Sequence, residues 1–134
     1  MKALSLKQPW ANLIIYRRKI IETRKWNTNY RGDLLICSSK SFDYDSIEPL
    51  NNYMHKYNVA FPLFMVPSAK AIGIVEIYDC KPMILEDEFQ ACCGVYPKAH
   101  SFFLRNIRPI KPFTVKGQLN IFNVDVKPED IIYL

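Results

Sequence analysis

The stretch LSLKQPWANLIIYRRKIIETRKW, residues 4 to 26, gathers ionisable side chains beside a tryptophan that can stack on a flat ligand. Lys19, Glu22 and Arg24 fall within six positions of one another. The β-branched content and alternation over residues 20 to 26 predict a strand, in which side chains two apart lie on the same face. Glu22 and Arg24 therefore share a face, where they either pair with each other or converge on a ligand.

The residues before this strand predict a strand followed by a helix. Residues 2 to 6 are typical of a short strand, and Gln8-Pro9-Trp10 of a strand exit with proline in the first helical turn. Trp10, Leu13 and Ile14 recur at helical spacing, so one face of the predicted helix packs on a core.

The rest of the chain contains more strand patterns than helix patterns. We predict a buried strand over 33–37, a helix over 46–57, a central strand over 71–78, an irregular segment over 81–98, and strands over 101–107 and 118–126 joined by the proline-marked RPIKPFTVKG. Helices that occur early, followed by strands, favour an α+β fold around a small, curved, mostly antiparallel sheet or barrel.

The composition indicates one compact domain over residues 1–134. The chain is 49% hydrophobic, and no apolar run approaches the roughly 20 residues that span a bilayer. It also lacks the long apolar region of a signal peptide. The four cysteines form no C-x-x-C pair, which is typical of reduced thiols. We therefore expect a cytoplasmic protein with no membrane contact.

The charge is polarised along the chain. The net charge is +7 over residues 1–40, −5 over 41–96 and +3 over 97–134, for a total of +5. If the two basic ends meet in the fold, they form a positive face suited to phosphates. The alternative is that these charges are ordinary solvated side chains.

Several enzyme classes lose support because their motifs are missing from the sequence. It contains no phosphate-binding P-loop, dinucleotide fingerprint, H-E-x-x-H helix or G-x-S-x-G elbow. Two histidines without a C-x-x-C pair do not suggest a zinc site. We expect no metal and no cofactor.

Two other polar groups are candidates for a site. Ser38, Ser39 and Lys40 directly follow a predicted buried strand, where they form either an anion or ribose cradle or a polar turn. Glu76 interrupts the apolar run AIGIVEIY and is either a second acid of the site or a paired structural acid.

The chain resembles an ASCH domain of the PUA-like superfamily across nearly its whole length. The resemblance rests on ALSLKQPWA near the start, the Lys19-x-x-Glu22-x-Arg24 cluster, Tyr30-Arg31-Gly32, Ser38-Ser39-Lys40, AIGIVEI, NIRPIKP and KGQLNIFNV. The family pattern is G-x-K-x-x-E-x-R, and Arg17 stands here in place of its glycine.

The resemblance implies a small PUA-like β-barrel flanked by helices, with a cleft that binds RNA or a nucleoside or nucleotide. Lys19, Glu22 and Arg24 would line this cleft. Its rim would comprise Lys7, Gln8 and Trp10. Its floor would comprise Ser38, Ser39 and Lys40. Arg24 or Lys19 could hold a phosphate, Trp10 or Trp26 could stack on a base, and Gln8 could read a base edge.

The resemblance also raises a hydrolase alternative. A branch with a similar fold removes acyl groups from the exocyclic amine of cytidine, using a lysine, a threonine three residues later and a glutamate. Here Glu22 occupies the threonine position, and Thr23 is expected on the other face of the strand. In a modified mechanism, Glu22 would activate water, Lys19 or Arg24 would stabilise the oxyanion, and Trp10 would hold the acylated base. Cleavage of an RNA phosphodiester is a related alternative.

A third hypothesis is a protein-interaction module that uses the acidic residues 86 to 88. It depends on charge alone.

Overall fold

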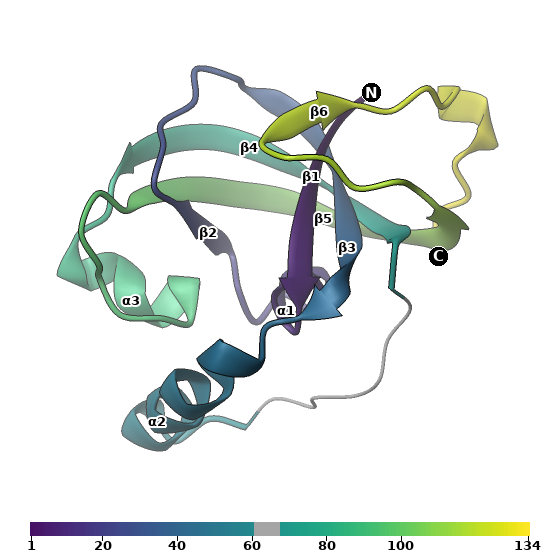
Figure 1. Ribbon diagram of the computed structural model, residues 1–134. Coiled ribbons are helices and arrows are strands. Elements are labelled where there is room, and N and C mark those ends of the chain that lie inside the picture. The colour runs from purple at the N-terminus through teal and green to yellow at the C-terminus, as the bar shows by residue number, and fades with distance from the viewer. Residues whose placement is uncertain (61–67) are drawn as a thin grey trace.

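The computed structural model describes residues 1–60 and 68–134 as a curved six-stranded sheet with three α-helices (Figure 1). The strands run in the order β2-β5-β4-β3-β1-β6 across the sheet. Their bounds are β1 Lys2–Gln8, β2 Ile21–Arg24, β3 Gly32–Phe42, β4 Lys70–Pro82, β5 His100–Thr114 and β6 Ile121–Asn123.

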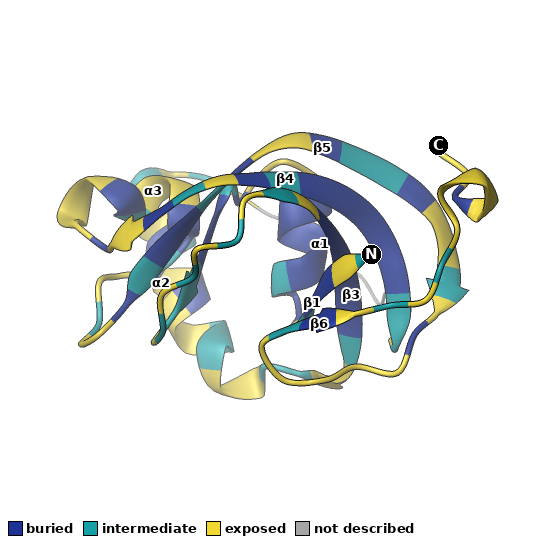
Figure 2. Ribbon diagram, turned by 90° about the horizontal axis from the view of Figure 1, so that it is seen from above, coloured by how far each residue is buried: buried dark blue, intermediate teal, exposed yellow. Residues whose placement is uncertain are grey.

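The sheet is mostly antiparallel, as predicted. Among the strands of the described residues, the β1–β3 pair is parallel and the other four ladders are antiparallel. The long strands β4 and β5 bend strongly, so the sheet curls (Figure 2). Strands β2 and β6 lie at its two edges, and no ladder joins them within the described residues. The α+β class is therefore confirmed, whereas the closed barrel is not.

The helices lie outside the hydrogen-bonded sheet, and their apolar side chains pack against the sheet and against each other. They are α1 (Trp10–Ile15), α2 (Ile47–Tyr57) and α3 (Glu88–Ala91), with 3₁₀ turns at Tyr44–Ser46, Leu85–Asp87 and Pro128–Asp130. The predicted helix over 46–57 is confirmed. Among the helices of residues 1–60 and 68–134, none is long and apolar enough to span a membrane.

The core occupies both faces of the central strands. In β3, Leu34 and Ile36 pack into the cluster that contains α1, whereas Leu35 and Cys37 pack into a second cluster on the other face. The sequence prediction that this strand is buried on both sides is confirmed. The side chain of Ile15 lies so close to Gly73 that an added Cβ there would come within 2.2 Å of it. The glycine therefore lets α1 approach β4.

Strand β5 corrects the prediction that a strand over 101–107 is followed by a separate proline-marked connection. It continues through Pro109 and Pro112 to Thr114. Beyond Phe103, β5 no longer pairs with β2. Proline has no backbone N–H, so it is tolerated where the strand has no β2 partner that would accept a hydrogen bond. Strand β6 is correspondingly shorter than the predicted 118–126, because residues 115–120 form a loop.

Candidate functional site

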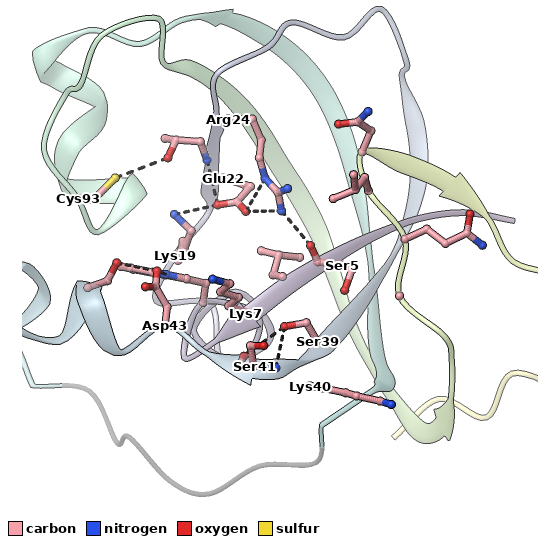
Figure 3. A pocket seen from close by; sticks show the side chains of 18 of the residues that line it. Ser5, Lys7, Lys19, Glu22, Arg24, Ser39, Lys40, Ser41, Asp43 and Cys93 are labelled. Carbon is pink, nitrogen blue, oxygen red and sulfur yellow. Dashed lines mark hydrogen bonds and ion pairs between the residues drawn. The ribbon is translucent and has the colours of Figure 1, made fainter.

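A pocket of about 1290 Å³ opens beside β2 and the end of β1 (Figure 3). Its lining comes from segments that are far apart in the sequence: residues 5–10, 19–26, 39–49, 93–96 and 114–120, together with Ala69. Five cations and two carboxylates line it: Lys7, Lys19, Arg24, Lys40 and Lys116, with Glu22 and Asp43. The basic N-terminal and C-terminal parts of the chain thus meet at one cavity.

Lys19 is almost completely buried in the pocket wall, with 1% of its surface exposed. It lies in the connection between α1 and β2. Its Nζ donates to the carbonyl oxygen of Ala91 at 2.6 Å and lies 3.4 Å from Glu22 Oε1. The same ammonium lies 5.1 Å from the ring centroid of Trp10, a cation–π distance. Lys19 is therefore a fixed buried charge.

Glu22 is hydrogen-bonded through both of its carboxylate oxygens. Oε1 accepts from the Thr23 amide at 2.9 Å, and Oε2 accepts from Arg24 Nε at 3.2 Å and Nη2 at 3.1 Å. Burial opposes ionisation of this carboxyl. The charges of Lys19 and Arg24 and the hydrogen bonds outweigh burial, so the pKa of Glu22 lies below its ordinary value. This geometry holds Glu22 as an ion-pair partner and makes it a weak base.

The lowered pKa of Glu22 predicts a loss of stability in acid. Its ionised form favours the folded state, so this contribution is present above the ordinary pKa of 4.5 and disappears as the pH falls through the folded-state value. We expect the unfolding free energy of the wild-type protein to fall more steeply below pH 4.5 than that of Glu22→Gln. Urea denaturation at a series of pH values measures the difference. Parallel profiles would contradict the assignment, and Glu86→Gln, at an exposed carboxylate, is the control.

Arg24 extends the ion pair into the open part of the pocket. Its side chain is 24% exposed, and Nη2 also donates to the carbonyl oxygen of Ser5 at 3.0 Å. The two hydrogen bonds from Arg24 to Glu22 Oε2 confirm that these two residues share a face of the strand. Thr23, expected on the opposite face, also lines the pocket on this edge strand. Its hydroxyl lies 3.7 Å from Cys93 Sγ.

Asp43 and Trp10 form a second polar unit of the pocket. Trp10 Nε1 donates to Asp43 Oδ2 at 2.8 Å, and the Ser46 hydroxyl donates to the same oxygen at 2.6 Å. Burial raises the pKa of Asp43, but these hydrogen bonds and the charge of Lys7 outweigh it, so the pKa lies below its ordinary value. Asp43 is thus an ionised acceptor held in a fixed position.

The structure brings most of the residues predicted from the sequence to this pocket. Lys7, Trp10, Ser39 and Lys40 line it, as do Trp26 and the ion-pair cluster. Trp26 also packs edge-on against Phe102, with ring centroids 5.0 Å apart. This tryptophan therefore belongs to both the core and the pocket wall.

Three predicted residues lie outside the lining. Gln8 is buried. Its Nε2 donates to Asn12 Oδ1, and its Oε1 accepts from the backbone N–H of Asn12. The hydroxyl of Ser38 donates to the carbonyl oxygen of Lys70. Glu76 pairs with Arg105 at 2.8 Å, which confirms the reading as a paired structural acid.

The sequence reasoning missed Asp43 and the loop over residues 115–120. The D-x-x-S spacing from Asp43 to Ser46, before a predicted helix, was an available signal for a side-chain turn. In the loop, only a glycine and a lysine could have indicated from the sequence that it lines the pocket. Gly117 approaches Ser5 so closely that an added Cβ would lie 2.9 Å from Ser5 Oγ. The loop therefore closes one wall of the pocket against β1.

A family model described as the ASCH domain matches residues 4–114, and the chain belongs to this family. The resemblance drawn from the sequence motifs is therefore confirmed. Arg17 has a φ of 63°, in the left-handed region that glycine adopts without strain. This conformation explains why the family pattern carries glycine at that position.

The individual proteins that this chain resembles have low sequence identity to it. It is 26% identical over 130 residues to Activating signal cointegrator 1 of Mus musculus and, equally, of Homo sapiens. The match covers 92% of this chain but spans only 22% of those relatives. The fold is similar to the crystal structure of ASCH from Zymomonas mobilis, with a TM-score of 0.62 at 13% identity, over 96% of this chain and 89% of that one.

Proposed function

We propose that residues 1–134 form one RNA-binding domain that holds single-stranded RNA, or its nucleotide units, in the pocket beside β2. The observation that carries the proposal is the meeting of five cations from both ends of the chain at one cavity with only two carboxylates. Counterion release from the phosphate backbone would supply much of the affinity.

The cations of the pocket have different roles in this proposal. Lys7, Lys40 and Lys116 are exposed and form no ion pair within the described residues, so they are available for phosphates. Lys19 is buried against Glu22, so it shapes the wall and leaves Arg24 as the partly exposed cation of the ion pair. Trp10 and Trp26 offer aromatic surface in the same cavity, which suits unstacked bases.

The hydrolase alternative has weaker support from the geometry. A general base needs a free lone pair and a pKa near the working pH, and Glu22 has hydrogen bonds on both oxygens and a lowered pKa. Incubation with N4-acylated cytidines and short RNAs, followed by mass spectrometry, tests for deacylation and phosphodiester cleavage. Turnover by the wild-type protein would favour the hydrolase over the binding domain, and its loss in Lys19→Ala and Glu22→Ala variants that remain folded would assign it to this site.

The pocket lysines provide the direct test of RNA binding. We expect Lys7→Ala/Lys40→Ala/Lys116→Ala to weaken binding to a short single-stranded RNA by roughly tenfold to a hundredfold at physiological salt. The slope of log affinity against log salt should fall in magnitude by about 2, since each lost contact with a single-strand phosphate contributes about 0.7. Fluorescence anisotropy over a salt series measures both quantities.

A matched control removes the same charge from elsewhere on the surface. Lys25→Ala/Lys111→Ala/Lys127→Ala changes three exposed lysines that do not line the pocket. This control should keep most of the affinity. Equal losses in the two triple variants would mean that RNA binds through net charge and not through this pocket.

A further inference from the structure

We infer that Asp43 makes the pocket selective for nucleobases that present an exocyclic amine, cytosine in preference to uracil. The inference rests on the proposed function, because it requires that a base enter the pocket. It concerns a residue that none of the family motifs contains, and it follows from the hydrogen bonds that this carboxylate accepts.

The first argument is that the two Asp43 oxygens differ in the side-chain hydrogen bonds they accept. Both side-chain hydrogen bonds that it accepts from the described residues, from Trp10 Nε1 and Ser46 Oγ, end on Oδ2. Oδ1 has no such bond within residues 1–60 and 68–134. A backbone hydrogen bond from Ser46 also stabilises this carboxylate, which is therefore fixed in position, and Oδ1, on which no side-chain donor of the described residues ends, has capacity to accept a further hydrogen bond.

The second argument compares the two carboxylates of the pocket. Glu22 accepts hydrogen bonds on both oxygens from Thr23 and Arg24 and has Lys19 at 3.4 Å, so its acceptor capacity is used within the protein. Asp43 is the remaining charged acceptor of the described lining. A carboxylate repels phosphate, so the ligand group that suits it is a hydrogen-bond donor, either a hydroxyl or an N–H group.

The third argument is that Asp43 lies beside an aromatic ring. Its bond to Trp10 Nε1 places the acceptor next to the indole edge, and Lys19 Nζ over the ring holds the indole from a face. In the inferred complex, a base that contacts this ring would direct its polar edge toward Asp43, and an exocyclic amine would then donate to Oδ1. Aspartate accepts hydrogen bonds from the N4 amine of cytosine, whereas uracil has a carbonyl oxygen at that position. Two acceptors facing each other cannot form a hydrogen bond.

The test compares cytidine and uridine oligonucleotides of equal length in fluorescence anisotropy. We expect the wild-type protein to bind the cytidine oligomer about tenfold more tightly than the uridine oligomer. A difference of this size is typical of one charge-assisted hydrogen bond. An oligomer of the pyrimidinone that lacks the 4-amino group should bind about tenfold more weakly than the cytidine oligomer. This comparison uses only the wild-type protein, so it does not depend on the folding of a variant.

Asp43→Asn separates selection from a structural role. Its amide oxygen can keep the hydrogen bonds from Trp10 and Ser46, which directs the amide NH₂ toward the ligand. This donor suits the uracil carbonyl, so the preference should reverse. Asp45→Asn removes the same charge at an exposed position outside the pocket lining and should keep the wild-type preference.

The outcomes distinguish the inference from the function on which it rests. Equal binding of the cytidine, uridine and pyrimidinone oligomers by the wild-type protein would overturn the inference and leave RNA binding intact. A cytidine preference that persists in a folded Asp43→Asn variant would assign selection to another residue and would also overturn it. The absence of binding to every oligonucleotide would overturn both proposals.

Discussion

Glu22→Ala should lower the free energy of unfolding by about 3–5 kcal/mol, the usual cost of removing one partner from a buried ion pair. Lys19 has 1% of its surface exposed, so its ammonium cannot regain water when the carboxylate is lost. The Ala91 carbonyl oxygen and the Trp10 ring would remain as its neighbours, and neither supplies a negative charge. Chemical denaturation monitored by tryptophan fluorescence measures the change.

A double substitution controls for the loss of side-chain volume. Lys19→Met/Glu22→Leu removes both buried charges and keeps apolar bulk, so it should be less destabilising than Glu22→Ala alone. Arg24 would keep its hydrogen bond to Ser5 and its contact with solvent. If Glu22→Ala stays within about 1 kcal/mol of the wild-type protein, the pair does not carry the electrostatic role described above.

Phe102→Ala should destabilise the protein by a similar amount, about 3–5 kcal/mol, since it opens a cavity in a closely packed core. Phe102 is completely buried and packs against the edge of Trp26. It also lies directly opposite Glu22 in the β2–β5 ladder. We therefore expect Trp26 to lose its support, with a change in tryptophan fluorescence that accompanies the shift in the denaturation midpoint.

The neighbouring phenylalanine is the matched control. Phe103 lies on the other face of β5, partly exposed, with Lys81 over its ring. Phe103→Ala removes the same side chain from the same strand and should cost clearly less. Equal costs for the two substitutions would show that backbone propensity, and not the core beneath Trp26, dominates the effect.

The sequence predicted those parts of the fold whose patterns are local. The two-residue spacing of Glu22 and Arg24 identified their common face, and apolar continuity identified β3 as buried on both sides. Helix α2 followed from its amphipathic spacing. Such features depend on neighbouring residues and can therefore be read without the tertiary structure.

Features that depend on partners distant in the sequence escaped prediction. Pro109 and Pro112 suggested a break, but whether proline is tolerated depends on where the neighbouring strand ends. Gln8 appeared in a motif beside pocket residues, yet its amide is used by Asn12 in the turn into α1. The role of Asp43 required knowledge of which oxygen Trp10 occupies.

The loop before β6 and the strand β1 meet at one wall of the cavity, although Ser5 and Asn120 stand near the two ends of the sequence. Contacts between such distant segments form late and slowly in folding, since the intervening chain must first be ordered. A partly folded chain would have no complete site. Ligand binding would therefore report completed folding, and a ligand at a hundred times its Kd would stabilise the whole chain by about 2.7 kcal/mol.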